Sequence, residues 1–309
     1  MSYMYEATRR AGHGQEIVAP IDVEEARIPP PPPELLARPS RDPGTLFEER
    51  IAQHPWRPFA PSFPTFARQG PVLEQFRGLR SHIFRAGKEK PLKSILISSG
   101  LPSEGKSFVA LNLAITMARH KDNKVLLIDG DLRRPALHAL LGAPNECGLS
   151  DYLTGSASIH AAMQKCSGGA AIDAAGGVDL ANITLIPAGL PRETSSELIA
   201  NQKVKELLLT VSDAFNWILI DSPPVLVFAD AVDLSRAADA VLLVVRGAQT
   251  TFDTAKQAQK SFGDSRILGV VLNDVKDPPR RGSYYGYGEY YGYGREPGRT
   301  VSDGGKAKK

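Results

Sequence analysis

The sequence predicts an α/β fold, a doubly wound domain on a mostly parallel sheet, and three observations support this prediction. Short apolar segments of strand length alternate with longer helical patterns between residues 94 and 272. These strands are so rich in apolar residues that both faces of the sheet must be covered by helices. A glycine-containing loop joins the first strand to the next helix, at the edge where parallel sheets commonly bind ligands.

The individual elements follow from the same patterns. Pro71 suits the first turn of a helix, and Leu73, Phe76, Leu79 and Ile83 then recur at helical spacing. We expect strands at residues 94–98, 125–129, 183–187, 217–221, 241–246 and 267–272. We expect the helices between them to include residues 107–119, 195–211 and 250–262. Right-handed crossovers then place helices on both faces of the sheet.

Composition divides the chain into three parts. Residues 1–70 contain 12 of the 24 prolines and show neither strand nor helix periodicity, which predicts a disordered, proline-rich arm. Residues 71–275 form the predicted domain, in which 21 basic residues balance 21 acidic ones. Residues 276–309 hold 8 basic residues against 4 acidic ones, and their Tyr and Gly repeats predict a flexible tail.

Composition also limits the classes of function. The balanced charge of the domain gives no indication of a nucleic-acid partner. Cys147 and Cys166 are too few for a disulfide framework or a four-thiolate metal site, which favours a reducing compartment. The N-terminus lacks the pattern of a secretion signal, and no segment reaches the roughly 20 apolar residues that span a bilayer. We therefore expect a cytoplasmic protein.

A phosphate-binding loop follows the first strand. The segment reads Gly100-Leu101-Pro102-Ser103-Glu104-Gly105-Lys106-Ser107, and a helical pattern begins at Phe108. This is the Walker A pattern, or P-loop, in its required setting between a strand and a helix. Its backbone N–H groups surround phosphates, Lys106 neutralises the β and γ oxygens, and Ser107 binds Mg²⁺. The sequence therefore predicts that residues 100–108 bind ATP.

Two further strands end in carboxylates at the edge of the sheet that faces this loop. The strand at 217–221 ends in Asp221, as in a Walker B motif, and the strand at 125–129 ends in Asp129, with Asp131 two residues later. Three carboxylates exceed what one Mg²⁺ ion requires, so one is available as a general base for an incoming hydroxyl. We assign Asp129 as the base and Asp131 and Asp221 as metal supports, and the roles of Asp129 and Asp131 are interchangeable at this stage.

These motifs together resemble the bacterial tyrosine autokinases of capsular and exopolysaccharide synthesis. In this sequence SSGLPSEGKS resembles the Walker A loop of that family, LLIDGDLRRP its second acidic motif, and ILIDSPP its Walker B motif. Glu74, Arg77 and Arg80 match the E-x-x-R-x-x-R motif that packs subunits of relatives into a ring. An ion pair on a solvated helix face is the simpler explanation of these three residues.

The resemblance implies a P-loop NTPase fold of the MinD and ParA type and an enzyme that transfers the γ-phosphoryl group of ATP to tyrosine with Mg²⁺. It places Asn273 near the adenine, although an asparagine that ends a strand is nearly as well explained by a turn. Lys106, Asp129, Asp131 and Asp221 would be the catalytic residues. Six of the nine tyrosines lie within ten residues of the tail, and we expect them to be the phosphate acceptors: Tyr284, Tyr285, Tyr287, Tyr290, Tyr291 and Tyr293.

The resemblance also implies partners. We expect a homo-oligomeric ring, a membrane chain-length regulator that activates the kinase, and a cognate tyrosine phosphatase. The protein would then be peripheral at the inner membrane through its regulator. The main alternative is a ParA- or MinD-like ATPase switch without kinase activity. Such proteins usually carry a second lysine directly after the first glycine of the loop, and Leu101 occupies that position here. An iron–sulfur carrier of related fold would need a closely spaced cysteine pair, which the sequence lacks.

Overall fold

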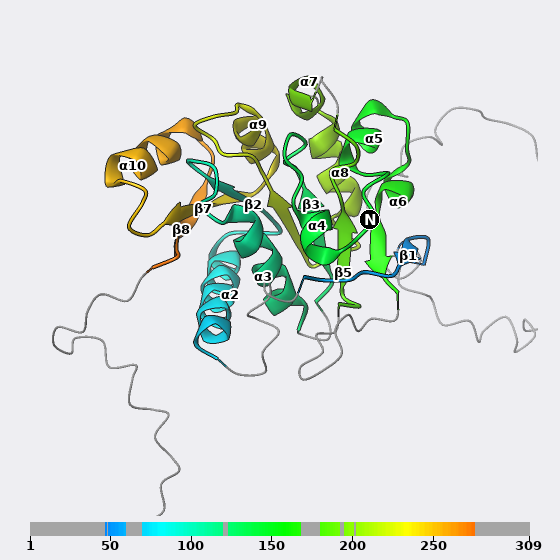
Figure 1. The fold of residues 1–309 in the computed structure, drawn as a ribbon, viewed down its shortest axis with the longest axis horizontal. Helices are drawn as coiled ribbons and strands as arrows, with labels where there is room; N and C mark the ends of the chain where they lie inside the picture. The colour runs from blue at the N-terminus through cyan, green and yellow to red at the C-terminus, as the bar shows by residue number, and fades with distance from the viewer. Residues whose placement is uncertain are drawn as a thin grey trace, which may run out of the picture. The chain divides into compact units, whose positions relative to one another are not determined.

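A sheet of eight strands runs through the part of the chain that the structure describes (Figure 1). The computed structural model describes residues 47, 49–59, 70–119, 123–167, 180–191, 195–200 and 202–275. The strands lie in the order β1-β4-β5-β3-β6-β2-β7-β8, and every neighbouring pair is parallel except β4 and β5. They are β1 (Ala52–His54), β2 (Ser94–Ser99), β3 (Val125–Asp129), β4 (Gln164–Cys166), β5 (Ile183–Ile186), β6 (Trp217–Asp221), β7 (Ala240–Arg246) and β8 (Ile267–Asn273).

Two layers of helices cover the sheet. Side chains from α2 (Pro71–Glu89), α3 (Lys106–Ala118) and α4 (Leu137–Leu141) share one apolar core with one face of the strands. Side chains from α5 (Leu149–Thr154), α8 (Lys203–Val211), α9 (Asp230–Ala237) and α10 (Phe252–Ser261) share the core on the other face. Two short helices, α6 (Ile159–Ala162) and α7 (Ser195–Ala200), complete the described helices. The doubly wound, mostly parallel sheet is thereby confirmed.

The central strands are buried because both of their faces are covered. Along β2, Ile95 and Ile97 pack in the core with α2 and α3, whereas Leu96 packs in the opposite core. This alternation is the two-residue period of a strand. All residues of β2, β3 and β5 are buried, which explains why apolar residues predominate in them and charged residues do not alternate along them.

Helix α3 carries the P-loop lysine and is the most buried helix of the described chain. It packs against both the sheet and α2, so residues 109–118 are all buried. Its two buried polar residues bond to the backbone of the preceding turn: Asn112 donates to the Phe108 carbonyl, and Thr116 donates to the Asn112 carbonyl. The packing on both sides fixes the N-terminus of α3 relative to the sheet edge.

The structure differs from the sequence prediction in three places. Strand β1 lies within the stretch predicted to be a disordered arm, and it pairs with β4, which was also not predicted. Nearby, Trp56 is buried and its indole donates to Gln164 Oε1 at 3.0 Å. Three-residue strands show no period, and only pairing across the fold reveals them. The single helix expected at 195–211 is two helices, α7 and α8.

The other boundaries agree closely with the prediction, and β3 and β6 agree at both ends. Residues 1–46 of the predicted arm and residues 276–309 of the predicted tail lie outside the described residues. The chain divides after Arg41 into two units, and all described residues belong to the second, residues 42–309. Within the described part of the chain, no helix combines the length and apolar character needed to cross a membrane.

Candidate active site

The P-loop joins the carboxyl end of β2 to the N-terminus of α3. Gly105 caps α3 with φ at 93°, a left-handed conformation that glycine adopts without strain. No side chain caps this helix. The first N–H groups of an α-helix have no partner within the helix, so the N-terminus of α3 offers donors and a positive dipole end to an anion. The predicted phosphate loop thus has the geometry that the Walker A pattern requires.

The two acidic strands meet at the same edge. β3 and β6 are neighbours, and their last residues, Asp129 and Asp221, are opposite each other in the parallel register. Gly130 donates its N–H to the Asp221 carbonyl at 2.8 Å. A Cβ atom at Gly130 would lie 2.7 Å from that same carbonyl oxygen, so the close approach of the two strand ends requires glycine here.

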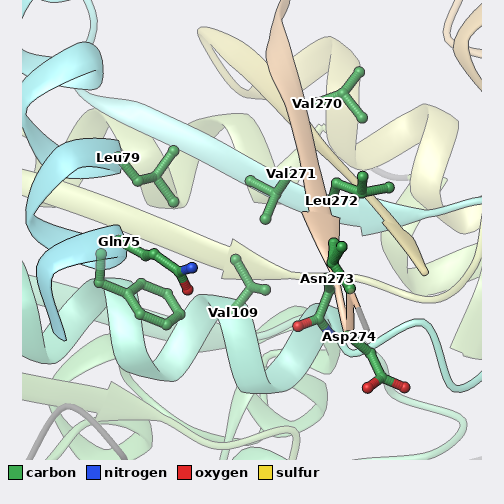
Figure 2. Close-up of a pocket in the computed structure, with 10 residues that line it drawn as sticks. Gln75, Leu79, Val109, Val270, Val271, Leu272, Asn273 and Asp274 are labelled. Carbon is green, nitrogen blue, oxygen red and sulfur yellow. The ribbon is translucent and has the colours of Figure 1, made fainter. Parts of the chain in front are cut away.

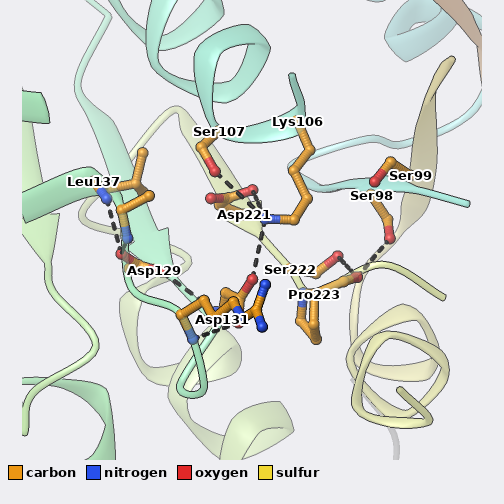
Figure 3. Close-up of polar contacts among 12 residues, drawn as sticks. Ser98, Ser99, Lys106, Ser107, Asp129, Asp131, Leu137, Asp221, Ser222 and Pro223 are labelled. Carbon is orange, nitrogen blue, oxygen red and sulfur yellow. Dashed lines mark hydrogen bonds and ion pairs between the residues drawn. The ribbon is translucent and has the colours of Figure 1, made fainter. Parts of the chain in front are cut away.

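Lys106 lies among the carboxylates (Figure 3). Its Nζ atom is 3.0 Å from Asp131 Oδ2 and 3.9 Å from Asp221 Oδ1. Burial by itself lowers the pKa of Lys106, but the charges of Asp221 and Asp131 outweigh it, so the pKa lies above its ordinary value. Lys106 is therefore a fixed positive charge at the point where β2, β3 and β6 end.

Asp129 is fully buried and is held by the turn that follows β3. Its Oδ2 atom accepts hydrogen bonds from the N–H groups of Ala136 and Leu137, both at 3.0 Å, and its Oδ1 atom accepts a longer one of 3.3 Å from Asp131. Burial, followed by the nearby charge of Asp221, raises the pKa of Asp129 to about 7. A carboxylate with this pKa can exchange a proton near neutral pH.

Asp221 is also fully buried, and neither of its carboxylate oxygens makes a hydrogen bond of acceptable geometry to another described residue. Burial raises its pKa to about 6, and the charge of Lys106 and the Ser107 hydroxyl act in the opposite direction. A buried carboxylate without hydrogen-bond donors is stabilised when a cation lies against it. Asp221 therefore fits a role beside a metal ion.

The donor set suits Mg²⁺ bound together with a nucleotide. Among the described residues, no group of three or more His, Cys, Asp or Glu forms a metal site by itself. Mg²⁺ commonly takes only one or two carboxylates, and phosphate oxygens and water complete its six ligands. The carboxylate of Asp221, which faces Lys106 at 3.9 Å, and Ser107 at the start of α3 agree with such a shared site.

Asp131 has partners for both oxygens: Oδ1 accepts the N–H of Arg134 at 3.0 Å, and Oδ2 contacts Lys106. The adjacent Arg133 pairs with Asp230 at 3.0 Å, and its guanidinium lies 4.5 Å from the ring centroid of Phe228. Asp131 therefore contacts the P-loop lysine, whereas Arg133 forms its ion pair with α9.

The end of β2 is fixed against the segment that follows β6. Ser98 donates to the Pro223 carbonyl at 3.1 Å (Figure 3), and the Ser222 hydroxyl donates to the Ile97 carbonyl at 3.2 Å. These bonds set the distance between the P-loop and the strand end that carries Asp221. Sequence reasoning identified neither serine, because hydroxyls at strand ends have no distinctive pattern.

The structure brings Lys106, Ser107 and the three predicted carboxylates together at one edge of the sheet, next to the rest of the P-loop. Asn273 lies at the end of β8 and donates to the Glu104 carbonyl of the P-loop at 3.0 Å. Arg77 pairs with Glu74 on the surface of α2, whereas Arg80 donates to the Thr116 carbonyl of α3 at 2.9 Å. The six tyrosines predicted to be phosphate acceptors lie outside the described residues.

Comparison with known proteins agrees with this geometry. The AAA domain family matches residues 93–262 and shows that the chain contains a nucleotide-binding domain. The tyrosine-protein kinase YwqD of Bacillus subtilis is 32% identical over 216 residues, which are 69% of this chain and 85% of that protein.

Two solved structures are also similar. The kinase domain of the Escherichia coli tyrosine kinase ETK has a TM-score of 0.60 and 30% identity, covering 69% of this chain and 80% of that one. The chimerical protein CapA2B2 has a TM-score of 0.62 and 28% identity, covering 75% of this chain and 99% of that one. On the strength of the motifs, the converging site and these similarities, the chain belongs to the bacterial tyrosine-kinase family of capsule and exopolysaccharide systems.

Proposed function

We propose that the protein transfers the γ-phosphoryl group of Mg²⁺·ATP to the C-terminal tyrosines of an adjacent copy of itself and thereby regulates polysaccharide synthesis and export. The observation that carries this proposal is the meeting of Lys106 with Asp129, Asp131 and Asp221 beside the uncapped N-terminus of α3. A triphosphate needs the lysine and the helix end, and a hydroxyl acceptor needs a base nearby.

In this proposal the protein positions the reactants and neutralises charge, because the transition state of phosphoryl transfer is loose. Lys106 stabilises the bridging β–γ oxygen and the transferred group. Ser107, Asp131 and Asp221 would hold Mg²⁺, which when bound supplies positive charge to the phosphate oxygens. The phenol oxygen forms the new bond to phosphorus, the bond to the bridging oxygen breaks, and ADP leaves.

Asp129 accepts the phenol proton. Its pKa of about 7 suits a base that works near neutral pH, and its Oδ1 atom makes only a 3.3 Å hydrogen bond. Asp131 is the less suitable base, because its Oδ2 atom is paired with the Lys106 ammonium at 3.0 Å. Asp131 therefore supports the metal and the lysine, and Asn273 would lie next to the adenine.

The tail would couple phosphorylation to assembly. It carries 8 basic and 4 acidic residues, and six phosphotyrosines would change its net charge from +4 to roughly −5 to −8, at about −1.5 to −2 each. Tails of that charge repel the acidic sites of neighbouring subunits. The cycle then alternates between an assembled, unphosphorylated ring, in which Glu74, Arg77 and Arg80 form contacts, and dispersed phosphorylated copies.

This cycle requires partners. A tyrosine phosphatase would return the tails to the unphosphorylated state. A membrane chain-length regulator would activate the kinase and hold it at the inner face of the membrane. Loss of membrane copurification when that regulator is deleted would support this part of the proposal, and unchanged copurification would oppose it.

The test is to incubate the full chain with Mg²⁺·ATP, with and without the regulator, and to map phosphate by mass spectrometry. We expect phosphotyrosine at residues 284–293 in the wild type and in Asp213→Asn, which changes an exposed carboxylate. We expect none in Lys106→Met and a loss of about 100-fold or more in rate in Asp129→Asn, since a general base contributes that much. ATP hydrolysis without phosphotyrosine, with the regulator present, would instead support the ATPase switch.

A further inference from the structure

Glu104 is a carboxylate within an anion-binding loop. Its charge opposes a bound triphosphate, so its position there requires another explanation. The residue is only 3% exposed. Buried carboxylates are stable only when hydrogen-bond donors or cations surround them. The partners of Glu104 therefore indicate what this residue does.

The carboxylate joins two parts of the site. Its Oε2 atom accepts the N–H of Leu101 at 2.7 Å and so closes the P-loop across three residues. Its Oε1 atom accepts the Thr250 hydroxyl in a short hydrogen bond, and also the N–H of Arg246 at 3.4 Å. Arg246 is the last residue of β7, and Thr250 lies in the connection that leads from β7 to α10. Glu104 thus ties the loop to the neighbouring strand.

Two carbonyls of the loop are fixed from the same side. Ser103 O accepts Arg246 Nη1 at 3.3 Å, and Glu104 O accepts Asn273 Nδ2 at 3.0 Å. Arg246 is itself paired with Asp274 at 2.8 Å. Figure 2 shows Asn273 and Asp274 at the end of β8, where both line a pocket that also includes residues of α2 and α3.

These bonds determine where the loop amides point. In a planar trans peptide the C=O and the following N–H are directed to opposite sides. When the carbonyls of Ser103 and Glu104 face Arg246 and Asn273, the N–H groups of Glu104 and Gly105 face away from β7 and β8. Ser103 adopts φ of 65°, a left-handed conformation that is strained for a non-glycine residue, so the loop needs external bonds to keep it.

We infer that Glu104 is a positioning residue, anchored by Thr250, which holds the P-loop amides in their anion-binding orientation. The inference rests on the proposed function only in taking the anion to be the phosphates of ATP. Without the anchor, the loop populates other conformations as well. The apparent affinity for the nucleotide then falls in proportion to the fraction of molecules whose loop is still in the binding conformation.

The experiment measures ADP affinity by titration calorimetry on the full chain, with no tyrosine transfer required. Glu104→Ala removes both oxygens, and we expect about tenfold weaker binding, because the loop then spends most of its time in conformations that do not bind the anion. Glu104→Gln keeps an acceptor for Leu101 and a polar group for Thr250, so it should bind within about threefold of wild type. Thr250→Val should weaken binding by about three- to tenfold, and Thr250→Ser should restore it.

Amide hydrogen exchange separates this role from general stability. The Leu101 amide should lose protection in Glu104→Ala and keep it in Glu89→Gln, an exposed control on α2, while protection in β3 and β6 stays unchanged. Unchanged or tighter ADP binding in Glu104→Ala would overturn the inference, and so would a loss of protection throughout the sheet. Failure of the kinase proposal would appear as missing phosphotyrosine with these ADP results intact.

Discussion

Asp129 and Asp221 are paired across two adjacent parallel strands, each as the last residue of its strand and each with no exposed surface. Two carboxylates in this arrangement destabilise each other when both are ionised, because water does not screen them. Lys106 lies 3.9 Å from one of them. The site is therefore arranged around an excess of negative charge, which Mg²⁺ bound with a nucleotide would balance.

This excess predicts how stability depends on pH in metal-free protein. An unfolded Asp has a pKa near 3.9, whereas the folded pKa of Asp129 is about 7. Between about pH 4 and pH 7 the folded state therefore keeps a proton that the unfolded state has lost. The free energy of unfolding falls over this range, and the contribution of Asp129 that is present at pH 4 is gone once the pH has risen through about 7. Asn does not ionise, so Asp129→Asn does not lose stability in this way. The melting temperature of the variant minus that of wild type should therefore increase from pH 5 to pH 8.

Thermal unfolding in chelator, at several pH values, measures this effect. Asp213→Asn, which changes an exposed carboxylate, should show a constant offset from wild type over the same range. An offset for Asp129→Asn that does not depend on pH would show that the carboxyl titrates near its ordinary value.

Lys106→Met should weaken ADP binding by roughly 10- to 100-fold, since hydrogen bonds to charged groups contribute about 1.5–3 kcal/mol each. It also removes the cation beside Asp131 and Asp221, so the variant should lose more stability than wild type between pH 6 and pH 8. Calorimetric titration and thermal unfolding check the two effects. Lys88→Met, an exposed position on α2, is the matched control and should leave both unchanged.

Gly105→Ala should lower the unfolding free energy by more than the strain of its positive φ angle alone would cause. A Cβ atom there would lie 2.0 Å from Asn273 Nδ2, at φ of 93°. Gly263→Ala is a useful control, because Gly263 also has positive φ but nothing lies within 4 Å. We expect a loss of about 1 kcal/mol of unfolding free energy for Gly263→Ala from backbone strain, and a larger loss for Gly105→Ala. Equal losses in denaturant unfolding would show that the loop moves away from Asn273 without cost.

Arg77 and Arg80 of the motif on α2 should have different roles, Arg80 in stability and Arg77 in contacts between subunits. Arg80 bonds to the Thr116 carbonyl on α3, so Arg80→Ala should lower the unfolding free energy by about 1 kcal/mol. Among the described residues Arg77 pairs with Glu74 at the surface, and Arg77→Ala should change stability by less than about 0.5 kcal/mol. If the motif joins subunits, Arg77→Ala should still reduce assembly in sedimentation. Unchanged assembly for Arg77→Ala would exclude Arg77 from the contact.

The sequence predicted the parts of the fold that depend on local pattern. The apolar strands β3 and β6 were placed at both ends, because a continuous apolar run that stops at an aspartate is visible without a structure. Since parallel strands share a carboxyl edge, Lys106, Asp129 and Asp221 could be expected to meet. The break between α7 and α8 and the short strands β1 and β4 depend on tertiary packing and were not predicted.

The supporting residues could not be predicted in the same way. Glu104 was placed in the loop by its motif, but its partners Arg246 and Thr250 lie more than 140 positions away in the chain. The only signal in the sequence was the presence of a carboxylate where phosphate binds. Asn273 was expected near the adenine. The structure shows that its side chain also donates a hydrogen bond to the Glu104 carbonyl of the P-loop, a contact that the sequence pattern does not predict.

The most direct test of the account is a mixing experiment with two full-length variants. One carries Phe at all six tail tyrosines and keeps the active site, and the other is Lys106→Met with an intact tail. With Mg²⁺·ATP and the regulator, mass spectrometry should find phosphotyrosine on the Lys106→Met chain only when the first variant is present. Phosphotyrosine on Lys106→Met alone, or its absence from the mixture while wild type is phosphorylated, would contradict transfer between copies through this lysine and its three carboxylates.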